Sequence, residues 1–160
     1  SGIEAISLRY FNVHGPRQDP NGAYAAVIPA FIQNMMNLQC PTIFGNGEAT
    51  RDFVSVTDVA VLNLAALTTD NSEALGEVFN VASGSTMSVL ELFNTLRTLL
   101  GEKKATINSI EPNFAPPREG DILHSSASIE KARKLLGFNP ETNPHLALSA
   151  TVEAYWDRCD

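Results

Sequence analysis

The residues best suited to bind an anionic ligand are two arginines, Arg51 and Arg118, with Asp121 three positions after the second. A guanidinium forms charge-assisted, often bidentate hydrogen bonds with phosphate oxygens, which a lysine does less well. A carboxylate accepts hydrogen bonds from hydroxyl groups. Because a single arginine is more often a solvated surface group, the assignment depends on the sequence segments that contain these residues.

Motifs of the common catalytic and cofactor sites are absent from the sequence. No two of the ten glycines lie three positions apart, so there is no GxxGxxG loop, and the residues after the lone GxG at 45–47 predict a strand instead of a helix. The three tyrosines are followed at the fourth position by His, Ile and Cys, so there is no Tyr-x-x-x-Lys pair. The scattered histidines and cysteines show no metal-ligand spacing. The sequence therefore predicts neither a catalytic residue nor a metal site.

The composition is that of a folded, acidic protein. Hydrophobic residues make up 44% and charged residues 18% of the 160 residues, which suits a single domain with a hydrophobic core. Eleven Lys and Arg against 18 Asp and Glu give a net charge of −7. This charge, without a basic run, argues against nucleic acids and anionic membranes as partners. A few arginines at one site can still bind a small diphosphate.

Cysteine use and the absence of a leader-like start favour a cytoplasmic protein. Cys40 and Cys159 lie far apart and indicate neither a disulfide framework nor a metal motif. The start, SGIEAISLRY, does not resemble a signal peptide, and we expect Ser1-Gly2 to be the edge of a fragment. The longest uncharged window, 20–47, contains prolines and polar residues and is no membrane helix.

Short predicted strands alternate with predicted helices, which indicates a mixed α/β (α+β) fold. The first strand, 6–13 (ISLRYFNV), is largely apolar, as in a strand buried on both faces of a parallel sheet. Ser88 and Glu91 predict a capping box, and Gly101 a C-cap, for the helix between them. Further strands are expected at 42–44, 52–56, 78–82 and 106–110, and helices at 29–38, 59–67 (capped by Thr57 or Asp58), 129–136 (capped by Ser128) and from 143–144 onward.

Three segments occur in an order that resembles a known family: 8–18 (LRYFNVHGPRQ), 45–59 (GNGEATRDFVSVTDV) and 118–121 (REGD). They are similar to the carboxyl-terminal half of extended short-chain dehydrogenases/reductases, the NAD-dependent epimerase/dehydratase family, and most of all to UDP-N-acetylglucosamine and UDP-glucose 4-epimerases. In that family an amino-terminal Rossmann half binds NAD and supplies the catalytic tyrosine and lysine. The resemblance implies that residues 1–160 form the nucleotide-sugar-binding domain, with 1–17 derived from a strand and loop of the Rossmann part, and that the NAD-binding half is missing.

The resemblance also implies roles for individual residues. The nicotinamide of NAD would pass Tyr10 and Phe11, and Asp52 would pair locally and support a loop. The remaining residues would bind the UDP-sugar: Asn12, Arg51 and Arg118 its phosphates, the backbone of Ala26 and Val27 the diphosphate, Thr42 the edge and Phe44 the face of the uracil, Asp121 the ribose, and Ser125 the hexose.

Ser125 further implies a preference among sugars. At this position of the epimerases a bulky aromatic leaves no room for a 2-acetamido group, whereas a small residue does. Residues 22–29 (GAYAAVIP) also resemble the acetamido-sugar branch. The sequence thus favours UDP-GlcNAc or UDP-GalNAc, although a surface serine before a helix is an equally simple interpretation of Ser125.

The predicted function is that of the UDP-sugar-binding half of an NAD-dependent 4-epimerase, inactive alone and without tight NAD binding of its own. Two alternatives stay open. One is a fragment of a nucleotide-sugar dehydratase or reductase, and the other is a stand-alone, non-catalytic binding or assembly module. Since the strand 6–13 would lack its sheet neighbours, we also expect the chain to form a homo-oligomer or to exchange segments through this edge.

Overall fold

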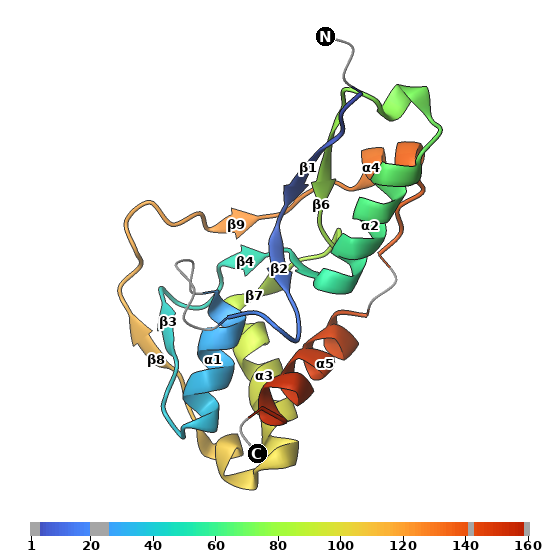
Figure 1. Cartoon of the computed structure of the whole chain (residues 1–160). Helices are drawn as coiled ribbons and strands as arrows, with labels where there is room; N and C mark the ends of the chain where they lie inside the picture. The colour runs from blue at the N-terminus through green and yellow to red at the C-terminus, as the bar shows by residue number, and fades with distance from the viewer. Residues whose placement is uncertain (1–3, 20–25, 141–142, 159–160) are drawn as a thin grey trace.

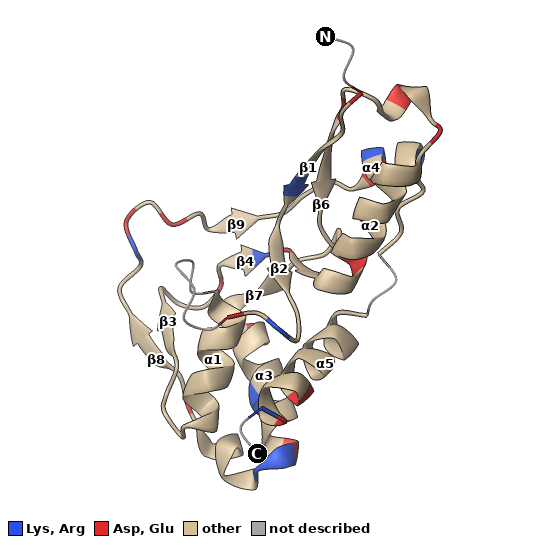
Figure 2. Ribbon diagram, viewed as in Figure 1, with Lys and Arg blue, Asp and Glu red and all other residues tan. Residues whose placement is uncertain are grey.

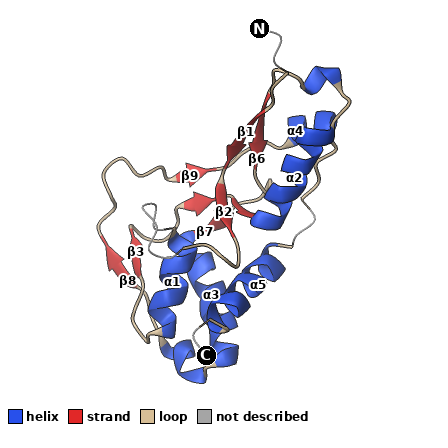
Figure 3. Cartoon of the chain, in the orientation of Figure 1, coloured by secondary structure: helices blue, strands red, loops and turns tan. Residues whose placement is uncertain are grey.

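The computed structural model describes residues 4–19, 26–140 and 143–158, and all structural statements refer to these. Its helices are α1 (Val27–Met36), α2 (Val56–Thr68), α3 (Val89–Lys103), α4 (Glu130–Leu136) and α5 (Pro144–Trp156), with 3₁₀ turns η1 (Ser72–Ala74) and η2 (Ala105–Ser109). Its strands are β1 (Ser7–Tyr10), β2 (Asn12–His14), β3 (Thr42–Phe44), β4 (Thr50–Arg51), β5 (Phe53–Ser55), β6 (Val78–Val81), β7 (Met87–Ser88), β8 (Asn113–Ala115) and β9 (His124–Ser125). The described residues therefore form the mixed α/β fold that the sequence predicts (Figure 3).

The strands form four small sheets and no continuous one within the described residues. Three are parallel pairs, β1 with β6, β2 with β5 and β3 with β8. In the fourth, β4 lies between antiparallel β7 and parallel β9. Three of these sheets run through the middle of the molecule, with helices at both ends, whereas β3 and β8 lie at one side beside α1 (Figure 1).

The predicted strand 6–13 is interrupted at Phe11. The N–H of Phe11 still donates to Val81, the last residue of β6, at 3.0 Å. The N–H of Asn12 then donates to the carbonyl of Asp52 at 3.2 Å, next to β5. The apolar run is thus divided because the chain pairs first with β6 and then with β5. This change of partner strand connects the two ends of the molecule.

Two separate hydrophobic cores stabilise the ends. The larger one lies among α1, α3 and α5, where Phe31 and Phe93 meet edge to face with ring centroids 6.0 Å apart. The smaller one lies under α2 and α4 against β6, around Phe79 and Phe138. In Figure 1 the two groups of helices occupy opposite ends of the molecule. Since β2 and β5 run between them, residues at this junction are positioned from both sides.

Helix signals in the sequence are largely confirmed, with corrections at the ends. The capping box of Ser88 and Glu91 is present, and Gly137 ends α4 in the left-handed conformation. Ser55 caps α2 in place of Thr57 or Asp58, because the strand 52–56 ends one residue earlier than predicted. Gly101 is not a C-cap, since α3 continues to Lys103.

The strand predicted at 106–110 is wrong. Residues 105–109 form the 3₁₀ turn η2, in which the N–H groups of Ile107 and Ile110 donate to Lys104 and Ile107 at 2.9 and 3.0 Å. Burial explains the misleading pattern, because Ile107 and Ile110 point into the larger core from a turn. None of the helices in the described ranges is long and apolar enough to cross a membrane.

Candidate functional site

A hollow of about 790 Å³ opens beside β3 and β8. One wall is the segment 116–123, which leads from β8 to β9 and which we call the strap. The strap contributes Arg118 and Asp121, and β3 contributes Phe44. The hollow is therefore built from segments far apart in sequence, and it combines aromatic and charged side chains.

The Arg51 guanidinium lies at the strap end of this hollow. Its Nη1 donates to the carbonyls of Thr50 and Leu123 at 2.9 and 3.3 Å, and its Nη2 lies 3.3 Å from Oδ1 of Asp121. The Arg51 side chain is only 18% exposed, whereas that of Asp121 is 49% exposed. Ser125 is the register partner of Arg51 in the ladder between β4 and β9. Arg51, Asp121 and Ser125, which the sequence predicts as site residues, are thus neighbours.

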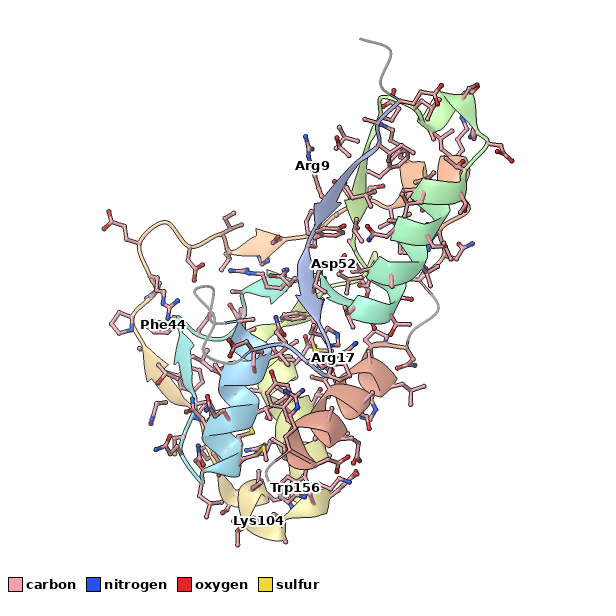
Figure 4. The ribbon with its side chains drawn as sticks, in the orientation of Figure 1. Arg9, Arg17, Phe44, Asp52, Lys104 and Trp156 are labelled. Atoms are coloured by element: carbon pink, nitrogen blue, oxygen red, sulfur yellow. The ribbon has the colours of Figure 1, made fainter. Side chains whose placement is uncertain are left out.

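Arg118 and Phe44 form the second contact across the hollow. The guanidinium carbon lies 3.8 Å from the centroid of the ring, a cation–π arrangement. Thr42 shares the exposed side of β3 with Phe44, because Ile43 between them points into the core. Figure 4 shows Phe44 at the outer edge of this strand. A planar ring and a guanidinium are therefore available at one place.

Asp52 is buried and positions the loop after β6. Its carboxylate accepts hydrogen bonds from the N–H of Ser83 at 2.7 Å, the hydroxyl of Ser83 at 2.8 Å and the N–H of Gly84 at 3.0 Å. The expectation that Asp52 supports a loop is confirmed. Its carbonyl also accepts from the side-chain amide of Asn12 at 2.9 Å, so Asn12 is held with one amide hydrogen engaged.

The other predicted residues lie outside the hollow around Phe44. Tyr10 is 52% exposed at the end of β1, where its hydroxyl donates to Asn63 at 3.0 Å. Phe11 is half-buried where the chain passes from β1 to β2. Ala26 and Val27 begin α1, and the N-cap residue Ala26 makes no side-chain hydrogen bond to the helix. The segment 22–29, which resembles the acetamido-sugar branch, lies mostly outside the described residues.

Sequence reasoning missed three apolar residues of the hollow and the role of one histidine. Phe114, Ile122 and Leu123 line the hollow although each is more than half exposed. The available signal was their size, since large apolar side chains in a stretch interrupted by prolines and glycine are typical of an exposed binding surface.

His14 is a buried residue at the junction of the two ends. Its Nδ1 lies 3.2 Å from the hydroxyl of Thr151, and that hydroxyl donates to Ala147, so His14 is the donor. Burial lowers the pKa of His14 to about 4, although the carboxylate of Asp58 acts in the opposite direction. His14 is therefore neutral at pH 7 and connects β2 to α5 by this hydrogen bond.

No group of three or more His, Cys, Asp or Glu in the described ranges could hold a metal ion.

The family of this chain follows from its similarity to known proteins. Residues 1–82 match the NAD dependent epimerase/dehydratase family. A putative UDP-glucose 4-epimerase from Methanocaldococcus jannaschii is 44% identical over 140 residues, which are 88% of this chain and 42% of that protein. The chain spans about half the length of the curated relatives it matches.

Two solved structures are similar over nearly the whole chain. A UDP-glucose 4-epimerase from Thermotoga maritima, solved with UDP-glucose, has a TM-score of 0.88 at 37% identity, covering 99% of this chain and 48% of that one. A UDP-N-acetylglucosamine 4-epimerase from Methanobrevibacter ruminantium, in complex with UDP-N-acetylmuramic acid, has a TM-score of 0.87 at 36% identity, covering 98% and 47%. With the family match over residues 1–82, these findings show that the chain belongs to the NAD dependent epimerase/dehydratase family.

Proposed function

We propose that this chain is the UDP-sugar-binding half of an NAD-dependent nucleotide-sugar 4-epimerase and is inactive alone. The observation that carries the proposal is that Phe44, Arg118 and Asp121 line one hollow and that Asp121 also contacts Arg51. The ring of Phe44 would stack on the uracil, the two guanidiniums would bind the diphosphate, and Asp121 would accept from ribose hydroxyls. The net charge of −7 does not oppose this, because the two arginines act at short range.

The sugar would lie next to Ser125, and we propose UDP-GlcNAc or UDP-GalNAc. Ser125 is half-buried beside Arg51 and carries a small side chain, which would leave more space for an acetamido group than a bulky aromatic would. One similar structure is that of a UDP-N-acetylglucosamine 4-epimerase, which supports the assignment.

The residues of this chain fit only one part of NAD. Tyr10 and Phe11 would contact the nicotinamide at the strand exchange, and the half-exposed ring of Tyr10 is accessible there. The sequence contains no glycine-rich loop for the NAD phosphates and no Tyr-x-x-x-Lys pair. When bound in the family, NAD takes and returns a hydride. This chain alone would neither bind NAD tightly nor carry out the proton transfer that accompanies hydride transfer.

We also propose a cytoplasmic protein that self-associates or exchanges segments through β1. Within the described residues β1 pairs on one edge only, with β6, and the side chains of Ser7, Arg9 and Tyr10 are exposed. An unpaired edge can accept a strand from another copy. Light scattering at high protein concentration should show a dimer or larger species, and a clean monomer would contradict this proposal.

Lys and Arg are scattered over several elements in Figure 2, which fits a small ligand better than a nucleic acid.

Calorimetric titration with UDP-GlcNAc, UDP-Gal, UDP and dTDP, without NAD, tests the function. We expect UDP and UDP-GlcNAc to bind and Arg118→Ala to weaken both at least tenfold. Arg133→Ala removes a positive charge from α4, away from the hollow, and serves as the matched control. Failure of every nucleotide to bind would contradict the proposal.

A further inference from the structure

Resting on the proposed function, we propose that the strap makes the nucleotide site self-occupied in the free protein. Two of its side chains occupy the positions that the nucleotide needs. Asp121 takes the place of a phosphate on Arg51, and Arg118 takes the place of the base on Phe44. Nucleotide binding is then an exchange of partners, in which both strap residues release a contact within the protein.

The Arg51 contact shows the first exchange. Because its Nη1 is bound to the backbone carbonyls of Thr50 and Leu123, Nε and Nη2 are left to meet an anion, and Nη2 faces Oδ1 of Asp121. A phosphate oxygen on Nη2 would compete directly with this carboxylate. The pair is 3.3 Å long and the Asp121 side chain is half exposed, so the contact is weak enough to be exchanged.

The Phe44 contact shows the second exchange. The ring is 36% exposed, and the guanidinium of Arg118 lies 3.8 Å from its centroid. A base stacked on this face would occupy the same space, since stacked rings and guanidiniums lie at similar separations. Displacement from the ring frees the charge of Arg118 for a phosphate.

The backbone of the strap can accommodate the displacement of Arg118 and Asp121. Its ends are fixed by backbone hydrogen bonds, from Gly45 to Ala115 at 2.8 Å and from Thr50 to Leu123 at 2.9 Å. Between Arg118 and Asp121 the backbone turns at Gly120, which has a φ of 79° and no atom within 4 Å of where a Cβ would be. Both exchanging side chains therefore lie on one turn with fixed ends and open surroundings.

The inference is tested with two half-ligands on the full chain. Inorganic pyrophosphate competes only with Asp121 and uridine only with Arg118. In Asp121→Asn we expect pyrophosphate to bind roughly two- to fivefold more tightly, the size of an exposed ion pair, and uridine to bind more weakly because the ribose loses its carboxylate. Glu119→Gln removes the same charge from the same strap without touching Arg51, and it should change pyrophosphate affinity less than Asp121→Asn does. Equal gains in both variants would overturn the inference, because general electrostatics would then explain them.

A second measurement needs no ligand. The N–H of Thr50 donates to Leu123 at the end of the strap, so its hydrogen exchange reports how firmly the strap is held. We expect exchange at Thr50 to be severalfold faster in Asp121→Asn than in Glu119→Gln. Equal exchange in the two variants overturns the strap contact. If the wild type and both variants all fail to bind pyrophosphate, uridine and UDP, the proposed function fails. The hydrogen exchange at Thr50 then decides separately whether Asp121 holds the strap.

Discussion

The carbonyl oxygen of Asp52 accepts two hydrogen bonds from one residue, Asn12: from its backbone N–H at 3.2 Å and from its side-chain amide at 2.9 Å. This double contact lies where the chain leaves the β1–β6 ladder and joins β5. The carboxylate of the same aspartate binds the loop at Ser83 and Gly84. Asp52 thus connects both ladders and the next loop, directly beside Arg51. Figure 4 shows it near β2, in the middle of the molecule.

Replacing Asp52 should be costly. Asp52→Asn keeps one acceptor oxygen but turns an NH₂ group toward backbone N–H donors, in a place without solvent access. We expect the free energy of unfolding in urea to fall by about 2–4 kcal/mol. Asp70→Asn, at an exposed position, removes the same charge and should leave the urea midpoint unchanged. A midpoint for Asp52→Asn equal to that of the wild type would show that the buried hydrogen bonds contribute little.

The buried His14 makes stability depend on pH. Its pKa is about 4 in the folded chain against 6.5 for the free side chain, so between these values the unfolded chain binds more protons. The stabilisation is fully present above pH 6.5 and is lost as the pH falls toward 4. It amounts to about 3 kcal/mol.

The measurement for His14 is urea unfolding at a series of pH values from 4 to 7.5. His14→Gln should flatten the pH dependence, because the group that takes up the extra proton is gone. His145→Gln replaces an exposed histidine and should leave the slope as in the wild type. Equal slopes in all three proteins would rule out His14 as the source.

Local signals in the sequence were sufficient wherever the structure is locally determined. The capping box of Ser88 and Glu91 depends on residues only three positions apart, and it was predicted. The strands β4, β7, β8 and β9 were not predicted, although β3 and β5, which were, have only three residues each. They exist because distant segments meet, which no local pattern reveals.

The candidate site, too, could be predicted only in part, because its contacts join distant segments. The motif segments containing Arg51 and Asp121 could be recognised in the sequence, and their types indicated anion and hydroxyl binding. That Asp121 faces Arg51 and that Arg118 covers Phe44 depends on how the strap folds back. The sequence therefore indicated the members of the site and not their partners in the free protein.

Leu38 occupies a position that suits glycine. It follows α1 with a φ of 57°, and the N–H groups of Leu38 and Gln39 donate to Met35 and Asn34 at 2.9 and 2.8 Å, which is the pattern of a Schellman motif. A leucine in this left-handed conformation is strained, and its side chain is half exposed. Leu38→Gly should therefore raise the free energy of unfolding by about 1 kcal/mol. Gln39→Gly, one position later and without a positive φ, should give no gain, and equal effects of the two would argue against strain at Leu38.

Gly101 gives a prediction opposite to helix propensity. In the middle of a helix, Gly→Ala normally stabilises by about 1 kcal/mol. Here a Cβ would lie 2.0 Å from Oδ1 and 2.5 Å from Cγ of Asn108, on η2. The amide end of the Asn108 side chain must turn away from α3 for the alanine to fit, so Gly101→Ala should lose the usual gain and lower the free energy of unfolding by up to about 1 kcal/mol.

Removing the obstacle should reverse the sign. Asn108→Ala shortens the side chain that approaches α3, and Asn108 itself is exposed. The double variant Gly101→Ala/Asn108→Ala should therefore be more stable than Gly101→Ala by at least the penalty of the single change, so the two effects are not additive. Urea unfolding of all four proteins gives the coupling energy. A coupling near zero would mean that η2 does not pack against Gly101, and that α3 continues past this glycine for another reason.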